Sequence, residues 1–143
     1  MAENNPYDVF TLIVAALAGT ALKQATSHMG VNHEGSPRID RSFAVMPSNA
    51  RGFVDGRIQN TVAGARIGDA YTIELGHILK PAAGLTAYNQ ALRDLQTAIV
   101  AITNGLVSEI NVSAISRTIQ GNGQYLVTSF TLQVFYRMSL VAS

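Results

Sequence analysis

The chain has 143 residues, a length typical of one domain, and 48% of them are hydrophobic, which is enough for a single core. It has no cysteine, so disulfides and thiolate metal sites are excluded, and its net charge of +1 gives no sign of a surface made for nucleic acid or membranes. Only 13% of the residues are charged, about half of the roughly 25% usual for soluble domains, and charge depletion is typical of surfaces buried between subunits.

The longest apolar stretch, Val9–Leu22, is interrupted by Thr11, Gly19 and Thr20. It is shorter than the roughly 18 to 20 residues that a membrane-spanning helix needs. The residues before it are acidic where a signal peptide has basic ones. We therefore expect a soluble protein that is made in the cytoplasm.

The first predicted helix begins at Pro6, after Asn5 as its cap, and is predicted to run to about His28, with Gly30 ending it. Its apolar residues cover more than one stripe, so the helix needs cover on two sides. Either its own sheet supplies all of that cover, or a second copy supplies part of it. The residues that the second alternative places in a subunit interface are Phe10, Ile13 and Leu17.

Two strands are predicted next, over residues 39–46 and 71–80, each followed by a proline. They form a hairpin whose connection, from Pro47 to Ile67, exceeds the roughly 12 to 15 residues beyond which unstructured loops are uncommon. Either this is a solvated loop, or it orders on a partner through charged hydrogen bonds and apolar anchors. The candidate contacts in it are Arg51, Phe53, Val54, Arg57 and Arg66.

The second predicted helix runs from Thr86, as its cap, to Gly105, as its stop. Two strands close the chain, beginning near Ile110 and Leu126, with a tight Gly-Asn-Gly turn at 121–123 between them.

The predicted fold class is α+β in the order helix–strand–strand–helix–strand–strand, with a roughly four-stranded, mostly antiparallel sheet packed by two helices. Residues 1–143 form one domain, and the loop at about 47–67 projects from one end of the sheet. The predicted core stripe of the second helix is Tyr88, Leu92, Leu95, Ile99, Ile102 and Leu106.

The sequence contains no Gly-x-Ser-x-Gly elbow, no phosphate-binding glycine loop and no close pair of carboxylates. His28 and His33 have no metal-ligand spacing and, with Glu34, would form a site only if their loop folded back; the alternative is solvated turn histidines. His77 lies on the apolar face of its strand and is predicted to be a core or interface histidine with one hydrogen bond. We therefore expect no enzyme activity, no cofactor and no metal.

Three segments and the order of the elements resemble a known family. The segments are Tyr71-Thr72-Ile73-Glu74-Leu75, Tyr88-Asn89-Gln90-Ala91-Leu92-Arg93-Asp94-Leu95 and Phe130-Thr131-Leu132-Gln133-Val134-Phe135-Tyr136-Arg137. Together they resemble the tail terminator and related tail-completion proteins of the neck of long-tailed bacteriophages. The likeness is one of element order and covers most of the chain.

This resemblance implies a structural protein of the virion, made in the host cytoplasm. It implies a hexameric ring that caps the tail tube, ends its polymerisation and joins tail to head. The implied partners are copies of the chain itself, the tail tube protein and a head-side connector protein, with DNA passing through the channel unread. The sheet edges and first helix would build the ring, and the long loop would reach toward the tube or the neck. The alternatives are a head-closure or adaptor protein of the neck, an oligomeric domain for a small hydrophobic ligand, and an enzyme whose active site is shared between chains.

Overall fold

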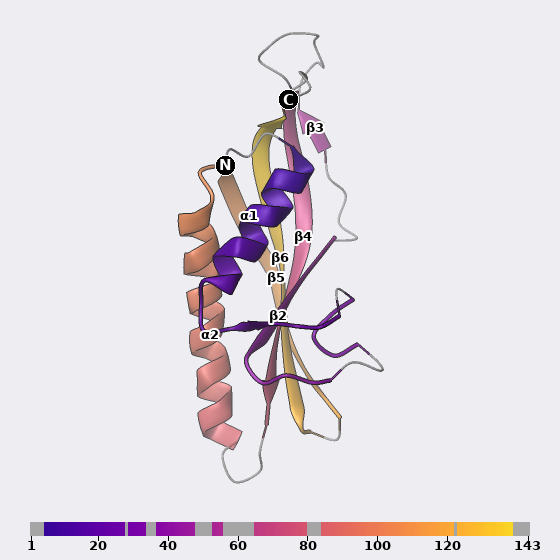
Figure 1. Cartoon of the computed structure of the whole chain (residues 1–143), viewed down its shortest axis with the longest axis vertical. Helices are drawn as coiled ribbons and strands as arrows, with labels where there is room; N and C mark the ends of the chain where they lie inside the picture. Colours follow the sequence, from indigo (N-terminus) through magenta and orange to yellow (C-terminus); the bar gives the residue numbers. More distant parts are fainter. Residues whose placement is uncertain are drawn as a thin grey trace.

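The computed structural model describes residues 5–27, 29–33, 37–47, 53–55, 65–79, 84–121 and 123–138 (Figure 1). They form an α+β fold, as the sequence predicts, and the long final hairpin and the hairpin before the second helix are both present. The elements in chain order are α1 (Pro6–Ala18), β1 (Lys23–Gln24), β2 (Ser42–Pro47), β3 (Phe53–Asp55), β4 (Ala65–Ile78), α2 (Gly84–Gly105), β5 (Glu109–Gln120) and β6 (Tyr125–Met138).

The strands form one mixed sheet in the order β1-β2-β4-β6-β5, with β3 also paired to β4. Along β2, β4, β6 and β5, each strand is antiparallel to the next, which agrees with the predicted mostly antiparallel sheet of about four strands. The two-residue strand β1, which is parallel to β2, and the three-residue strand β3 are additions that the sequence did not predict. Both are too short to show a two-residue periodicity.

The first helix ends at Ala18, ten residues before the predicted end near His28, which itself lies outside the described residues. The hydroxyl of Thr20 donates a hydrogen bond of 2.6 Å to the carbonyl oxygen of Leu17 and so occupies an acceptor at the helix end. Lys23 then donates its backbone N–H to the carbonyl oxygen of Arg41 at 2.8 Å, which joins the chain to the sheet. Pairing with β2 therefore replaces the last predicted helical turns.

The strand predicted at 71–80 is β4, and it begins earlier, at Ala65. Its first residues pair with β3 on one side and with β6 on the other. The predicted loop of 47–67 is therefore strand at both Phe53–Asp55 and Ala65–Ile67, and this corrects its reading as a connection without secondary structure. The rest of that segment lies outside the described residues.

The second helix begins at Gly84, so Thr86 lies within it and is not its cap, while Gly105 is its last residue as predicted. The face that α2 buries is also rotated from the predicted one, because Tyr88 and Leu92 are exposed. Leu95, Ile102 and Leu106 of the predicted stripe are buried in the main core, and Ala91, Asp94 and Ala98 beside them are buried as well. The buried residues of α2 are Ala91, Asp94, Leu95, Ala98 and Ile102.

The main core lies between the helices and one face of the sheet. It joins Ile13 and Leu17 of α1 to residues of β2, β4, α2 and β6. A second, smaller cluster on the opposite face contains Val31, Ala44, Tyr125 and Val127. Figure 1 shows α2 on one side of the twisted sheet and the chain between β1 and β2 on the other. Both faces are thus partly covered by the chain itself.

Candidate functional site

A buried ionic cluster ties α2 to the sheet. Asp94 accepts two hydrogen bonds from Arg41, from Nε at 3.0 Å and from Nη2 at 2.9 Å. It accepts a third from the amide of Gln90 at 3.0 Å, and its Oδ2 lies 2.7 Å from Nε2 of His77. Asp94 is 3% exposed and His77 is 1% exposed. The cluster therefore connects the turn before β2, the end of β4 and the middle of α2.

The surroundings of Asp94 keep it ionised. Burial alone would raise its pKa, but the hydrogen bonds from Arg41, His77 and Gln90 and the charge of Arg41 outweigh burial and lower the pKa below its ordinary value of 3.8. The hydrogen bond to Asp94 likewise raises the pKa of Arg41. A paired, hydrogen-bonded buried carboxylate of this kind holds elements together.

The prediction for His77 is confirmed: it is a core histidine with one hydrogen-bond partner, Asp94, and its Nδ1 has none among the described residues. Sequence reasoning missed the roles of Arg41 and Asp94. The signal for Asp94 was its place among the alanines of α2, at helical spacing from Ala91 and Ala98. His77 and Asp94 are both almost fully buried, so the arrangement of this pair is that of a contact that holds the fold together.

The three residues of the first helix that were predicted to form a subunit interface lie in two different environments. Ile13 and Leu17 are fully buried in the core of the chain itself, which corrects their assignment to a subunit interface. For these two, the sheet of the same chain supplies the cover. Phe10 is half-buried, and its ring centroid lies 6.3 Å from that of Tyr71.

The predicted contacts of the long loop remain a prediction. Arg51 and Arg57 lie outside the described residues. Phe53 and Val54 belong to β3, and Arg66 lies opposite Asp55 in β4. The structure thus brings the backbones of Phe53, Val54 and Arg66 together at one end of β4.

An exposed apolar surface lies along α2 and β5, and we call it the α2–β5 surface. One flank of α2 faces β2 and α1. Asp94 lies on this flank and bonds Arg41, which precedes β2, and Gly105 lies on it because a Cβ added there would be 2.9 Å from the Cβ of Ala16 in α1. With about 3.6 residues per turn, the large apolar residues of α2 lie on its other flank, toward β5. The surface consists of Leu85 (76% exposed), Tyr88 (38%), Leu92 (39%), Ile115 (47%) and Ile119 (58%).

The strand β5 forms one edge of the sheet, because β6 is its only strand neighbour among the described elements. A bulge between Ser113 and Ser116, with Ala114 at a φ of 54°, divides it into two halves. The second half, from Ser116 to Gln120, contains one charged residue, Arg117. An exposed, weakly charged edge strand is a template for pairing with another chain.

A small pocket lies at the other edge of the sheet, and we call it the β2-edge pocket. Its volume is about 130 Å³. It opens between α1 and β2, where the chain leaves β1. Its lining residues are Phe10, Val14, Gln24, Ala25, Thr26, Ser27, Ala44 and Val45.

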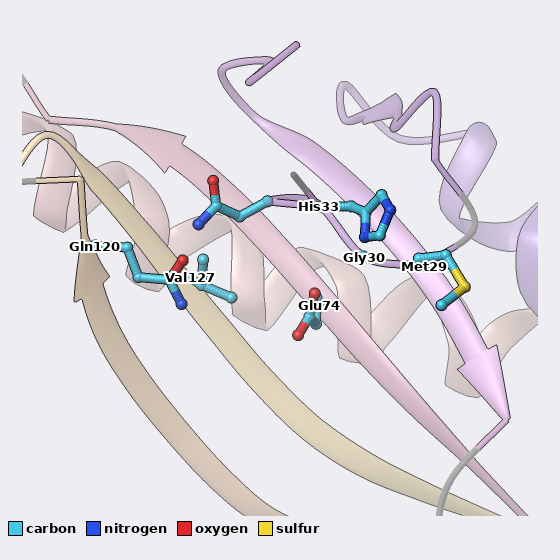
Figure 2. A pocket seen from close by; sticks show the side chains of 7 residues that line it. Met29, Gly30, His33, Glu74, Gln120 and Val127 are labelled. Atoms are coloured by element: carbon cyan, nitrogen blue, oxygen red, sulfur yellow. The ribbon is translucent and has the colours of Figure 1, made fainter. Parts of the chain in front are cut away.

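A second pocket, of about 220 Å³, lies on the sheet face opposite the helices. Figure 2 shows Glu74 and Val127 in it, from β4 and β6, and Met29, Gly30 and His33, from the segment that crosses the sheet. Oε1 of Glu74 accepts the backbone N–H of Val31 at 3.2 Å, which fixes that segment. Both pockets are smaller than the roughly 300 Å³ at which sites for drug-sized ligands begin.

Within the described ranges, no group of three or more histidine, aspartate or glutamate residues is placed to hold a metal ion. His28 and Glu34 lie outside those ranges. The same part of the chain contains no helix with the length and hydropathy of a membrane span.

The chain matches no protein-family model and no curated protein.

Proposed function

We propose that this protein is a structural protein of a bacteriophage virion, a tail terminator whose copies form a ring on the tail tube. The ring would end polymerisation of the tube and join the tail to the head, with DNA passing through its channel. The observation that carries the proposal is the α2–β5 surface, an apolar, weakly charged surface beside an open sheet edge. Such a surface is typical of a protein that is buried against neighbours.

The element order supports the same proposal. A helix, a strand hairpin, a second helix and a long final hairpin follow one another in the chain, which is the element order on which the resemblance to tail terminators rests. A role as an enzyme has less support, because His77 and Asp94 are almost fully buried within the described residues. A role in binding a small ligand has less support because the two pockets are small.

Electron microscopy of the purified chain, alone and with the tail tube protein encoded in the same genome, tests the proposal. We expect closed rings with a central pore, bound to one end of each tube, and tubes that stop growing once capped. A chain that remains monomeric and binds no tube end would contradict the proposal. Rings that bind the head-side connector and never the tube would identify a head-closure protein instead.

The long loop offers a separate prediction. Replacing both Arg51 and Arg57 with alanine is expected to leave folding intact and to weaken assembly on the tube by about tenfold, because charged hydrogen bonds to the partner are lost. Assembly of the wild type should also weaken as the salt concentration rises. The measurement is a pelleting assay with tubes. Arg93→Ala, on the exposed face of α2, is the control, and equal binding by all three proteins would argue against the loop contact.

A further inference from the structure

The two edges of the antiparallel sheet carry different features. One edge is β5, flanked by the α2–β5 surface. The other is β2, where β1 pairs with only Ser42 and Phe43 and the β2-edge pocket opens beside the following residues. In the described part of the chain, no strand pairs with β2 from Ala44 to Met46 on that side. Each edge thus has residues without a strand partner on its outer side, and at β2 these residues lie beside residues 25–27 in the pocket lining.

The directions of the strands allow these two edges to join. Each of β2, β4, β6 and β5 is antiparallel to the next, so β5 runs opposite to β2. A β2 strand from a second copy, placed beside β5 in the same orientation, therefore continues the antiparallel alternation. Each copy contributes the four strands β2, β4, β6 and β5. Because four is an even number, the antiparallel alternation continues however many copies are added.

The faces of the sheet match as well. Ile119 is paired with a buried residue of β6 on the face that the helices cover. Val45 belongs to the main core on that same face. In a sheet that continues from β5 of one copy to β2 of the next, Ile119 therefore comes beside Phe10 and Val14, which line the β2-edge pocket. Apolar side chains on one edge thus meet an apolar pocket on the other.

We propose that copies of this protein associate head to tail, with the α2–β5 surface of one copy seated on the β2-edge pocket of the next. A contact between two different surfaces closes into a ring or continues as a filament, and the proposed function requires the ring. A second copy supplies both a strand edge and apolar side chains. A pocket of about 130 Å³ accepts single side chains and is too small for a drug-sized ligand.

Cross-linking of the full chain tests this contact, because it has no cysteine of its own. The variant with both Ile119→Cys and Thr26→Cys carries one thiol on each edge, at exposed positions. A short bismaleimide is expected to convert it into a ladder of multimers. Each single variant should give no multimers, and a mixture of the two should give one cross-linked dimer.

Two results would overturn the proposal. If Ile119→Cys alone links to itself, the β5 edges meet about a two-fold axis instead. If the double variant gives no multimers, the surfaces do not meet, and another protein or nothing covers them.

A second measurement places a charged side chain in the proposed contact and determines its effect on self-association. Ile119→Asp is expected to weaken self-association by at least about tenfold, because it places an unpaired carboxylate in the apolar contact. Val100→Asp, an equally drastic change at an exposed position of α2 away from β5, should leave it unchanged. Circular dichroism confirms that both variants fold. Equal association constants for Ile119→Asp and the wild type would contradict the contact.

These results separate the interface from the proposed function. Rings that persist in Ile119→Asp would overturn the interface and leave the tail terminator in place. A cross-linked ladder from a chain that never binds tubes would support the interface and remove the tail role.

Discussion

Replacing Asp94 with asparagine is expected to lower the free energy of unfolding by about 2–4 kcal/mol. Breaking a fully buried ion pair costs about 3–5 kcal/mol, and we lower that range because the side chain of Arg41 is 38% exposed. Asparagine keeps the shape of the side chain and removes its charge, so Arg41 and His77 lose the ion that they contact. Urea denaturation at pH 7 measures the loss. Arg93→Gln, the neighbouring position on the exposed face of α2, should change stability by less than about 0.5 kcal/mol.

The pH dependence of this loss gives a second test. The folded state lowers the pKa of Asp94 below 3.8, so its contribution is fully present above that pH and is lost as the pH falls through the lowered value. The difference in stability between wild type and Asp94→Asn should therefore be constant near neutrality and shrink below about pH 3.8. A difference that is unchanged down to pH 2 would show that the charge of Asp94 contributes nothing.

Gly76→Ala is also expected to lower the free energy of unfolding by roughly 2–4 kcal/mol, because it overpacks the core and breaks hydrogen bonds. A Cβ at this position would overlap the hydroxyl oxygen of Tyr125 and lie 2.9 Å from Oγ of Ser42. Tyr125 has no room to move, because it is fully buried and its hydroxyl lies 3.0 Å from the carbonyl oxygen of Ile39. Thermal or urea denaturation measures the effect.

Two further variants control this result. Gly19→Ala at the end of α1 should be nearly neutral, since the nearest atom to its Cβ would be 3.5 Å away. Adding Tyr125→Phe to Gly76→Ala removes the overlapping oxygen and should recover part of the loss. If the double variant is less stable by the sum of both single effects, the close contact is not the cause.

The sequence was sufficient for the elements whose periodicity is long and unbroken. The alternation along β4 and β6 and the glycine turn between β5 and β6 predicted those strands, the two hairpins β2–β4 and β5–β6 and the buried position of His77, but not the pairing of β4 with β6. The end of α1 was missed because Ala21 and Leu22 continue the apolar pattern beyond Gly19, whereas the hydrogen bond from Thr20 and pairing with a distant strand end the helix there.

The candidate interface was harder to predict. The large residues of α2 repeat at core spacing, so Tyr88 and Leu92 were assigned to the core with Leu95 and Ile102, whereas the structure buries Ala91 and Ala98 and leaves Tyr88 and Leu92 exposed. Ile115 follows Ala114 directly and breaks the alternation of β5, which is the signal of the bulge. An apolar pattern alone does not say whether the chain or a neighbour covers it; the fold decides which residues the chain leaves exposed.

The proposed function depends on self-association into a closed ring, and sedimentation velocity of the purified wild-type chain measures this association. We expect a concentration-dependent species that reaches six times the monomer mass and grows no further. A single monomeric species at every concentration, with and without tube ends, would contradict it.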